Sequence, residues 1–130
     1  MLAARCTLWD VTHSNPTFTT VLLPGLACDA ELWRAQWSVL AARHWPAISD
    51  AHHRADTIPA MAELVLSEHP GKLVLVGASM GGRVALEVAR RAPERVQGLA
   101  LLGSTARADS ETLRATRQQA IEMFQEIGRA

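Results

Sequence analysis

One short segment constrains the fold of this chain more than any other feature. The segment GASMG at residues 77–81 fits the pattern G-x-S-x-G, and it lies between an apolar run at residues 73–76 and an amphipathic stretch. This pattern requires a strand to turn abruptly into a helix, with Ser79 at the tip of the turn. Glycines on both sides of the serine leave room for strand and helix to approach closely. The segment therefore predicts a strand–turn–helix unit.

Short apolar runs alternate with amphipathic stretches along the chain. Residues 19–23, 73–76 and 99–102 predict three strands, and a shorter extended piece is predicted at 47–49. The two later runs are apolar on both faces, which is typical of strands covered on both sides. The alternation predicts right-handed βαβ units in an α/β fold: a parallel sheet of about four strands with flanking helices, in three α/β/α layers. In this sheet we expect residues 73–76 to be central and residues 99–102 to form an edge.

The stretches between these runs carry helix signals. Asp29 is placed to cap a helix over about residues 29–42. Thr57 or Asp56 is placed to cap the next helix, which ends at Pro70. The helix after the GASMG segment has small apolar residues on one face and charged residues on the other, so its small face can lie close against a sheet.

A last helix is predicted near the C-terminal end of the sequence. Either Ser110 or Asp109 is placed to cap it. Its expected apolar face includes Leu113, Ala120, Ile121, Phe124 and Ile127.

Length and composition fit a single globular domain over residues 1–130. The chain has 48% hydrophobic and 20% charged residues, and thirteen basic residues balance thirteen acidic ones. This balance gives no reason to expect nucleic acid or an anionic membrane as a partner. No apolar stretch approaches the roughly 20 residues that a spanning helix needs, and the first residues lack a signal-peptide core. We therefore expect a cytoplasmic protein.

The two cysteines, Cys6 and Cys28, form neither a disulfide framework nor a closely spaced pair of metal ligands. We expect free thiols, no metal and no cofactor, while a single Cys6–Cys28 bridge stays open. Residues 6–11 are a candidate for one additional, antiparallel strand.

Several segments together resemble a known family. They are VLLPGL at residues 21–26, LW at 32–33, LVLVGASMGG at 73–82, APERV at 92–96 and LALLG at 99–103. From Thr19 onward the chain resembles the N-terminal half of the α/β-hydrolase fold family, and residues 109–130 resemble the start of its helical cap region.

The resemblance implies a role for each residue of the motif. Ser79 would be the nucleophile, between the elbow glycines Gly77 and Gly81. The backbone N–H groups of Leu26 and Met80 would form the oxyanion hole. The substrate would then be a small-molecule ester, thioester or other acyl compound. The alternative that Ser79 only caps the following helix, in a glycine-rich turn, stays open.

The general base that such a serine needs is missing from the later part of the sequence. In this fold the chain order is Ser, then Asp or Glu, then His, yet all five histidines precede Ser79. We expect His69 at the opposite end of the sheet from Ser79, His52 and His53 as surface loop residues, and Asp109 as a helix cap.

The chain therefore looks like a hydrolase that stops about halfway. Three functions remain: a serine hydrolase, a non-catalytic binding module on the same fold, and an acyltransferase or lyase of the family. Relatives pair further strands beyond the one that matches residues 99–102, so an open edge here predicts self-association.

Overall fold

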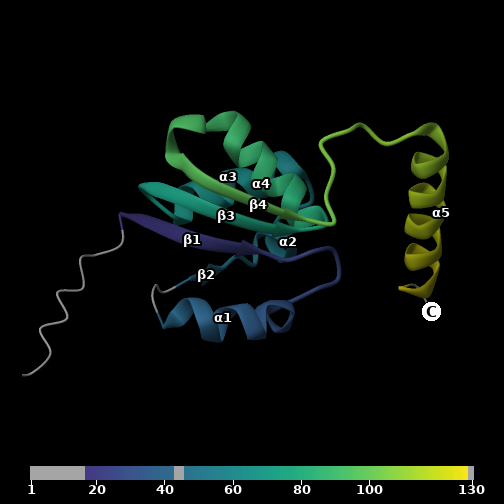
Figure 1. Ribbon diagram of the computed structural model, residues 1–130. Coiled ribbons are helices and arrows are strands. Elements are labelled where there is room, and N and C mark those ends of the chain that lie inside the picture. The colour runs from purple at the N-terminus through teal and green to yellow at the C-terminus, as the bar shows by residue number, and fades with distance from the viewer. Residues whose placement is uncertain (1–16, 43–45, 129–130) are drawn as a thin grey trace, which may run out of the picture.

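The computed structural model describes residues 17–42 and 46–128 (Figure 1). Residue Cys6 and the candidate strand at residues 6–11 lie outside this part of the chain. The elements, in chain order, are β1 (Phe18–Leu23), the 3-10 helix η1 (Ala30–Trp33), α1 (Arg34–Ala41), β2 (Ala47–Ile48), α2 (Ala51–Arg54), α3 (Ile58–Glu68), β3 (Lys72–Ala78), α4 (Met80–Arg91), η2 (Pro93–Arg95), β4 (Val96–Leu102) and α5 (Glu111–Ile127).

Four parallel strands form one sheet in the order β2-β1-β3-β4. Leu22 of β1 lies beside Val76 of β3, and Leu75 of β3 lies beside Leu99 of β4. The predicted parallel α/β sheet is confirmed, with residues 73–76 inside it and residues 99–102 at its edge. Because all strands run in one direction, the turns after β1, β3 and β4 meet at the same edge of the sheet.

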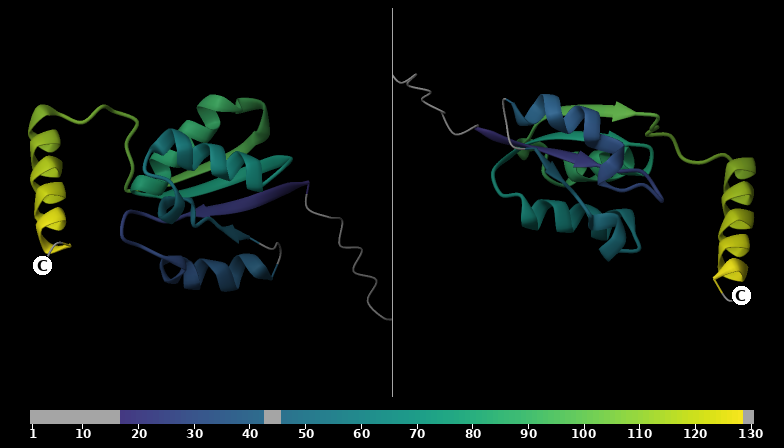
Figure 2. Two further views of the ribbon diagram at one scale, coloured as in Figure 1. Left: turned by 180° about the vertical axis from the view of Figure 1, so that it is seen from behind. Right: turned by 90° about the horizontal axis from the view of Figure 1, so that it is seen from below.

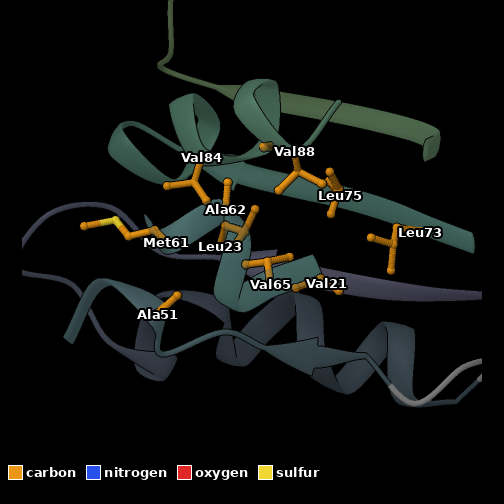
Figure 3. Close-up of a cluster of buried hydrophobic side chains, with 11 residues drawn as sticks. Val21, Leu23, Ala51, Met61, Ala62, Val65, Leu73, Leu75, Val84 and Val88 are labelled. Atoms are coloured by element: carbon orange, nitrogen blue, oxygen red, sulfur yellow. The ribbon is translucent and has the colours of Figure 1, made fainter. Parts of the chain in front are cut away.

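Helices cover both faces of the sheet, which gives the predicted three layers. Helices α3 and α4 lie on one face, and α1 lies on the other, beside β1 and β2 (Figures 1 and 2). The main core fills the space between the sheet and the α3–α4 layer (Figure 3). Its buried residues are Val21, Leu23, Ala51, Met61, Ala62, Val65, Leu73, Leu75, Val84, Ala85 and Val88.

Side chains cap the beginnings of the first two predicted helices. The hydroxyl of Thr57 accepts a hydrogen bond from Ala60 N, so Thr57 rather than Asp56 caps α3. Asp29 accepts from Glu31 N, but the helix that it begins is not continuous. The chain forms η1 up to Trp33 and only then α1, so the single helix predicted over residues 29–42 is wrong in this detail.

Strand β4 is far more exposed than the sequence predicts. The side chains of Leu99, Leu101 and Leu102 are 41%, 39% and 48% exposed. An apolar run was expected to be covered on both faces. The run is apolar, but the strand lies at the edge of the sheet, beyond most of the helical cover in the described part of the chain.

Helix α5 stands apart from the sheet, at the end of the connection over residues 103–110 (Figure 1). Its expected apolar face is present but not buried: Leu113 is 40% exposed, Ile121 49% and Phe124 64%. Among the described helices, none is both long enough and apolar enough to cross a membrane.

Candidate active site

Ser79 lies at the junction between β3 and α4, at the edge where the strands end. Its backbone has φ 51° and ψ −114°, a strained conformation for a residue with a side chain. The N–H of Ser79 donates to the carbonyl of Leu102 at 2.8 Å, which extends the pairing of β3 with β4. Its side chain is exposed and makes no capping hydrogen bond to α4. Ser79 therefore occupies the N-cap position of α4, but its hydroxyl does not cap the helix.

The two glycines of the motif are needed because the backbone is crowded around this turn. A Cβ at Gly77 would lie 2.5 Å from the carbonyl oxygen of Gly81. A Cβ at Gly81 would lie 2.5 Å from the carbonyl oxygen of Pro24 and would also collide with that of Leu23. The turn at residues 77–81, called the elbow below, thus packs directly against the end of β1. Any larger residue at Gly77 or Gly81 would push strand and helix apart.

The turn after β1 lies against the elbow. A Cβ at Gly25 would be 3.4 Å from Ser79 Cβ. The N–H of Cys28 donates to the carbonyl of Gly25 at 3.2 Å and closes the turn, in which Ala27 has φ 57°.

Within the described residues, the N–H of Leu26 has no hydrogen-bond acceptor. The N–H of Met80, at the first position of α4, likewise has none there.

Ser104 is a site residue that the sequence reasoning missed. Its hydroxyl donates to the carbonyl of Ser79 at 2.7 Å and lies 3.3 Å from the carbonyl of Leu102. A Cβ at Gly82 would collide with the Ser104 side chain, so the two residues fit together closely. The signal was available: Ser104 follows the strand beside β3, and the ends of neighbouring parallel strands meet.

A cavity of about 640 Å³ opens beside the serine, between the elbow and α5. Apolar groups and charged groups share its wall. Its lining residues are Leu26, Asp56, Ile58, Met61, Ser79, Met80, Arg83, Gly103, Ser104, Thr105, Arg117 and Ile121. The exposed hydroxyl of Ser79 and residues of the turn after β1 therefore face a space that can hold a small molecule.

Asp109 does not cap α5, and that prediction is wrong. Ser110 is the cap, since its hydroxyl accepts from Leu113 N at 3.2 Å.

The Asp109 carboxylate instead pairs with Arg83 of α4 at 2.5 Å and with Arg117 of α5 at 3.0 Å. The hydrogen bond from Arg83 and the positive charges of Arg117 and Arg114 hold the pKa of Asp109 below its usual value.

His69 lies far from the serine, as predicted. It is the C-cap of α3, before β3 begins, whereas Ser79 follows the end of β3. The seven residues of that strand separate them by roughly 20 Å, at about 3.3 Å per residue. Burial lowers the pKa of His69, and Arg95 donates to its carbonyl oxygen.

The other described histidines lie on α2 and differ from each other. His53 is exposed, as predicted, but both histidines lie on a helix, so the loop predicted for them is wrong. His52 is half-buried, and its Nε2 donates to the carbonyl of Cys28 at 2.7 Å. None of the three described histidines lines the cavity beside Ser79. The described residues contain no group of three or more His, Cys, Asp or Glu side chains that could hold a metal ion.

Comparisons with known proteins bear on this geometry. A family model described as the alpha/beta hydrolase fold matches residues 46–129. The chain is also similar to the solved structure of a thermophilic esterase from Thermogutta terrifontis with malate bound, at 29% sequence identity and a TM-score of 0.65. The match covers 82% of this chain and 44% of the esterase chain, so this chain spans less than half the length of that protein.

Proposed function

Since this chain belongs to the α/β-hydrolase fold family, we propose that it carries the nucleophile of a serine hydrolase. The proposed nucleophile is Ser79, held between Gly77 and Gly81. The proposed substrate is a small-molecule ester, thioester or other acyl compound. The observation that carries the proposal is the exposed hydroxyl of Ser79 on a strained strand-to-helix turn that borders a cavity.

The proposed chemistry has two steps. The Ser79 hydroxyl attacks the carbonyl carbon, its proton passes to a base, and the alcohol or thiol leaves to give an acyl-enzyme. Water then attacks the acyl-enzyme and releases the acid. The N–H groups of Leu26 and Met80, which have no other acceptor among the described residues, are the proposed donors to the oxyanion.

The base is the part of this proposal for which the described residues offer no candidate. All five histidines precede Ser79 in the sequence, and those described in the structure do not line its cavity. Without a base, what remains is the help of the oxyanion hole and of binding. We therefore propose that this chain alone reacts slowly with acyl compounds.

Helix α5 and the connection before it are the proposed start of a cap over the site. Arg117 and Ile121 of α5 line the same cavity as Ser79. Because a cap shapes the pocket wall, its apolar side chains would contact the acyl or alcohol part of a substrate.

The test is exposure of the purified chain to a fluorophosphonate probe, followed by mass spectrometry of its peptides. We expect slow labelling on the peptide that contains Ser79 and none after Ser79→Ala. Ser67→Ala is the matched control: this exposed serine lies on α3 and only hydrogen-bonds to its own helix, so labelling should not change.

One outcome would overturn the proposed nucleophile, and another would overturn only the slow reaction. A folded chain whose Ser79 stays unlabelled at high probe concentration over many hours would favour a non-catalytic binding module on this fold. Rapid, stoichiometric labelling would show that a working base is present and that the slow reaction is wrong.

A further inference from the structure

His52 makes a long-range contact that nothing in the site described above explains. Its Nε2 donates to the carbonyl of Cys28 at 2.7 Å, across 24 positions of the chain. The ring is half-buried on α2, which follows β2, whereas Cys28 lies in the connection after β1. A carbonyl oxygen can only accept, so the Nε2 of His52 carries the proton in this contact.

The segment that receives this hydrogen bond needs support. Ala27 has φ 57°, a left-handed conformation that disfavours a residue with a Cβ. The bond from Cys28 N to Gly25 O closes the turn locally, but it does not fix the turn relative to the rest of the fold. The bond from His52 reaches the residue directly after Ala27 and ties it to α2.

The same turn lies against the elbow. The position of a Cβ on Gly25 is 3.4 Å from Ser79 Cβ and 3.6 Å from Cys28 Sγ. Leu26, which follows Gly25, has a free N–H among the described residues and lines the cavity beside Ser79. A shift of the turn therefore moves the Leu26 N–H relative to the Ser79 hydroxyl.

We propose that His52 is a positioning residue, which holds the turn at residues 25–28 in place so that the Leu26 N–H keeps its distance from Ser79. This inference rests on the proposed function for the role of Leu26, but the hydrogen bond and the order of the turn are independent of it. In this proposal His52 contacts neither the substrate nor the hydroxyl group of Ser79. Its other ring nitrogen, Nδ1, does not contribute to holding the turn.

Three variants of the full chain separate this role from a general structural one. His52→Gln keeps an N–H donor at about the place of Nε2, His52→Asn offers one only nearer the backbone, and His52→Leu keeps volume without a donor. In ¹H–¹⁵N spectra, we expect the amides of Leu26, Ala27 and Cys28 to shift and broaden in His52→Leu and His52→Asn. They should return towards the native positions in His52→Gln.

The wild-type ring gives a direct signature. Its ¹⁵N resonances should report a protonated Nε2 and, in the neutral ring, an unprotonated Nδ1. The matched control is His53→Leu. This neighbouring histidine is exposed, and its ring centroid lies 3.9 Å from that of His52, so the variant perturbs the surroundings without removing the bond to Cys28.

The chemical readout is the rate at which the fluorophosphonate probe labels Ser79. We expect about tenfold slower labelling in His52→Leu and His52→Asn, a near-native rate in His52→Gln, and no change in His53→Leu. Unshifted turn amides in a folded His52→Leu, or an unprotonated Nε2 in the wild type, would overturn the inference. A wild type that is never labelled would defeat the proposed function alone, because the amide shifts still decide the role of His52.

Discussion

Arg83 Nη2 donates to Asp109 Oδ1 at 2.5 Å, and this contact ties α4 to the connection that leads into α5. The other carboxylate oxygen of Asp109 pairs with Arg117 Nε at 3.0 Å. One carboxylate therefore links the helix that follows Ser79 to the helix on the far side of the cavity. Although the apolar face of α5 is largely exposed, this ion pair holds α5 near the site.

Replacing Asp109 should release α5. In Asp109→Asn, both guanidinium groups lose their shared negative partner, and the amide cannot accept equally well from two cations. We expect faster hydrogen exchange in residues 103–117 and faster tryptic cleavage after Arg107, with little change over β1 and β3. Glu111→Gln is the matched control, since Glu111 is a nearby exposed carboxylate without an ion pair among the described residues. Equal exchange in both variants would contradict the role of the ion pair.

The stability of α4 should depend on pH through Glu87. Hydrogen bonds from Arg90 and Arg91 lower the pKa of Glu87 to about 2 in the folded chain. Because this pKa is lower in the folded chain, the ionised carboxylate stabilises the fold fully at pH values above the unfolded pKa of about 4.3. This stabilisation is lost as the pH falls towards 2. The Glu87 carboxyl carbon should therefore titrate near pH 2 in ¹³C spectra. Urea midpoints of the wild type and of Glu87→Gln should differ at pH 6 and converge near pH 2; parallel curves would argue against the pairing.

Gly81 should tolerate no side chain. A Cβ there would lie 2.5 Å from the carbonyl oxygen of Pro24 and collide with that of Leu23, both of which are backbone atoms. We expect Gly81→Ala to lower the free energy of unfolding by about 3 kcal/mol or more, because strand and helix must separate. Gly128→Ala, at the exposed end of α5, should be nearly neutral. Urea denaturation of both variants checks the difference, and a native midpoint in Gly81→Ala would refute the close packing.

Two leucines that lie side by side in the sheet should respond oppositely to a charge. Leu75 is fully buried on β3, whereas its neighbour Leu99 on β4 is 41% exposed. Leu75→Asp buries an unpaired carboxylate and should cost about 4 kcal/mol or more, enough to prevent folding. Leu99→Asp keeps its charge in water and should leave a folded chain. Circular dichroism with thermal melting separates them, and a cooperatively folded Leu75→Asp would contradict the burial.

We also predict self-association of the chain through the open edge of β4. The leucines at positions 99, 101 and 102 are exposed, and this edge of β4 has no strand partner among residues 17–42 and 46–128, so it forms a template for another strand. Light scattering of the wild type should show dimers or larger species that dissociate on dilution. Leu101→Lys should shift the chain towards monomer, because charge on an edge strand opposes pairing. A wild type that stays monomeric at high concentration would contradict the prediction.

The fold could be predicted because its main signals are local. The apolar run before Ser79 and the glycine pattern around it specify a strand, a sharp turn and a helix without reference to the rest of the chain. The parallel sheet then follows from the alternation of strands and helices. The position of residues 99–102 at the edge was also correct, but their burial was not, because an apolar pattern does not report whether a helix is present to cover it.

Contacts between distant segments were the part that local patterns could not supply. Asp109 has the spacing of a helix cap, yet Arg83, which lies 26 positions away, competes for its carboxylate. The residues next to His52 in the sequence are typical of a surface segment. The fold nevertheless brings the carbonyl of Cys28 within hydrogen-bond distance of the His52 ring. Ser104 became visible as a partner of Ser79 only once β4 was placed beside β3.

The positive φ of Ser79 determines which residue selection for stability alone would favour at position 79. Glycine adopts φ near 51° without the steric penalty that a Cβ incurs there, a penalty on the order of 1–3 kcal/mol. A library of random variants sorted only for thermal resistance should therefore accumulate glycine at position 79. Serine at that position would persist only in lineages in which its hydroxyl is under selection for a task other than holding the chain together.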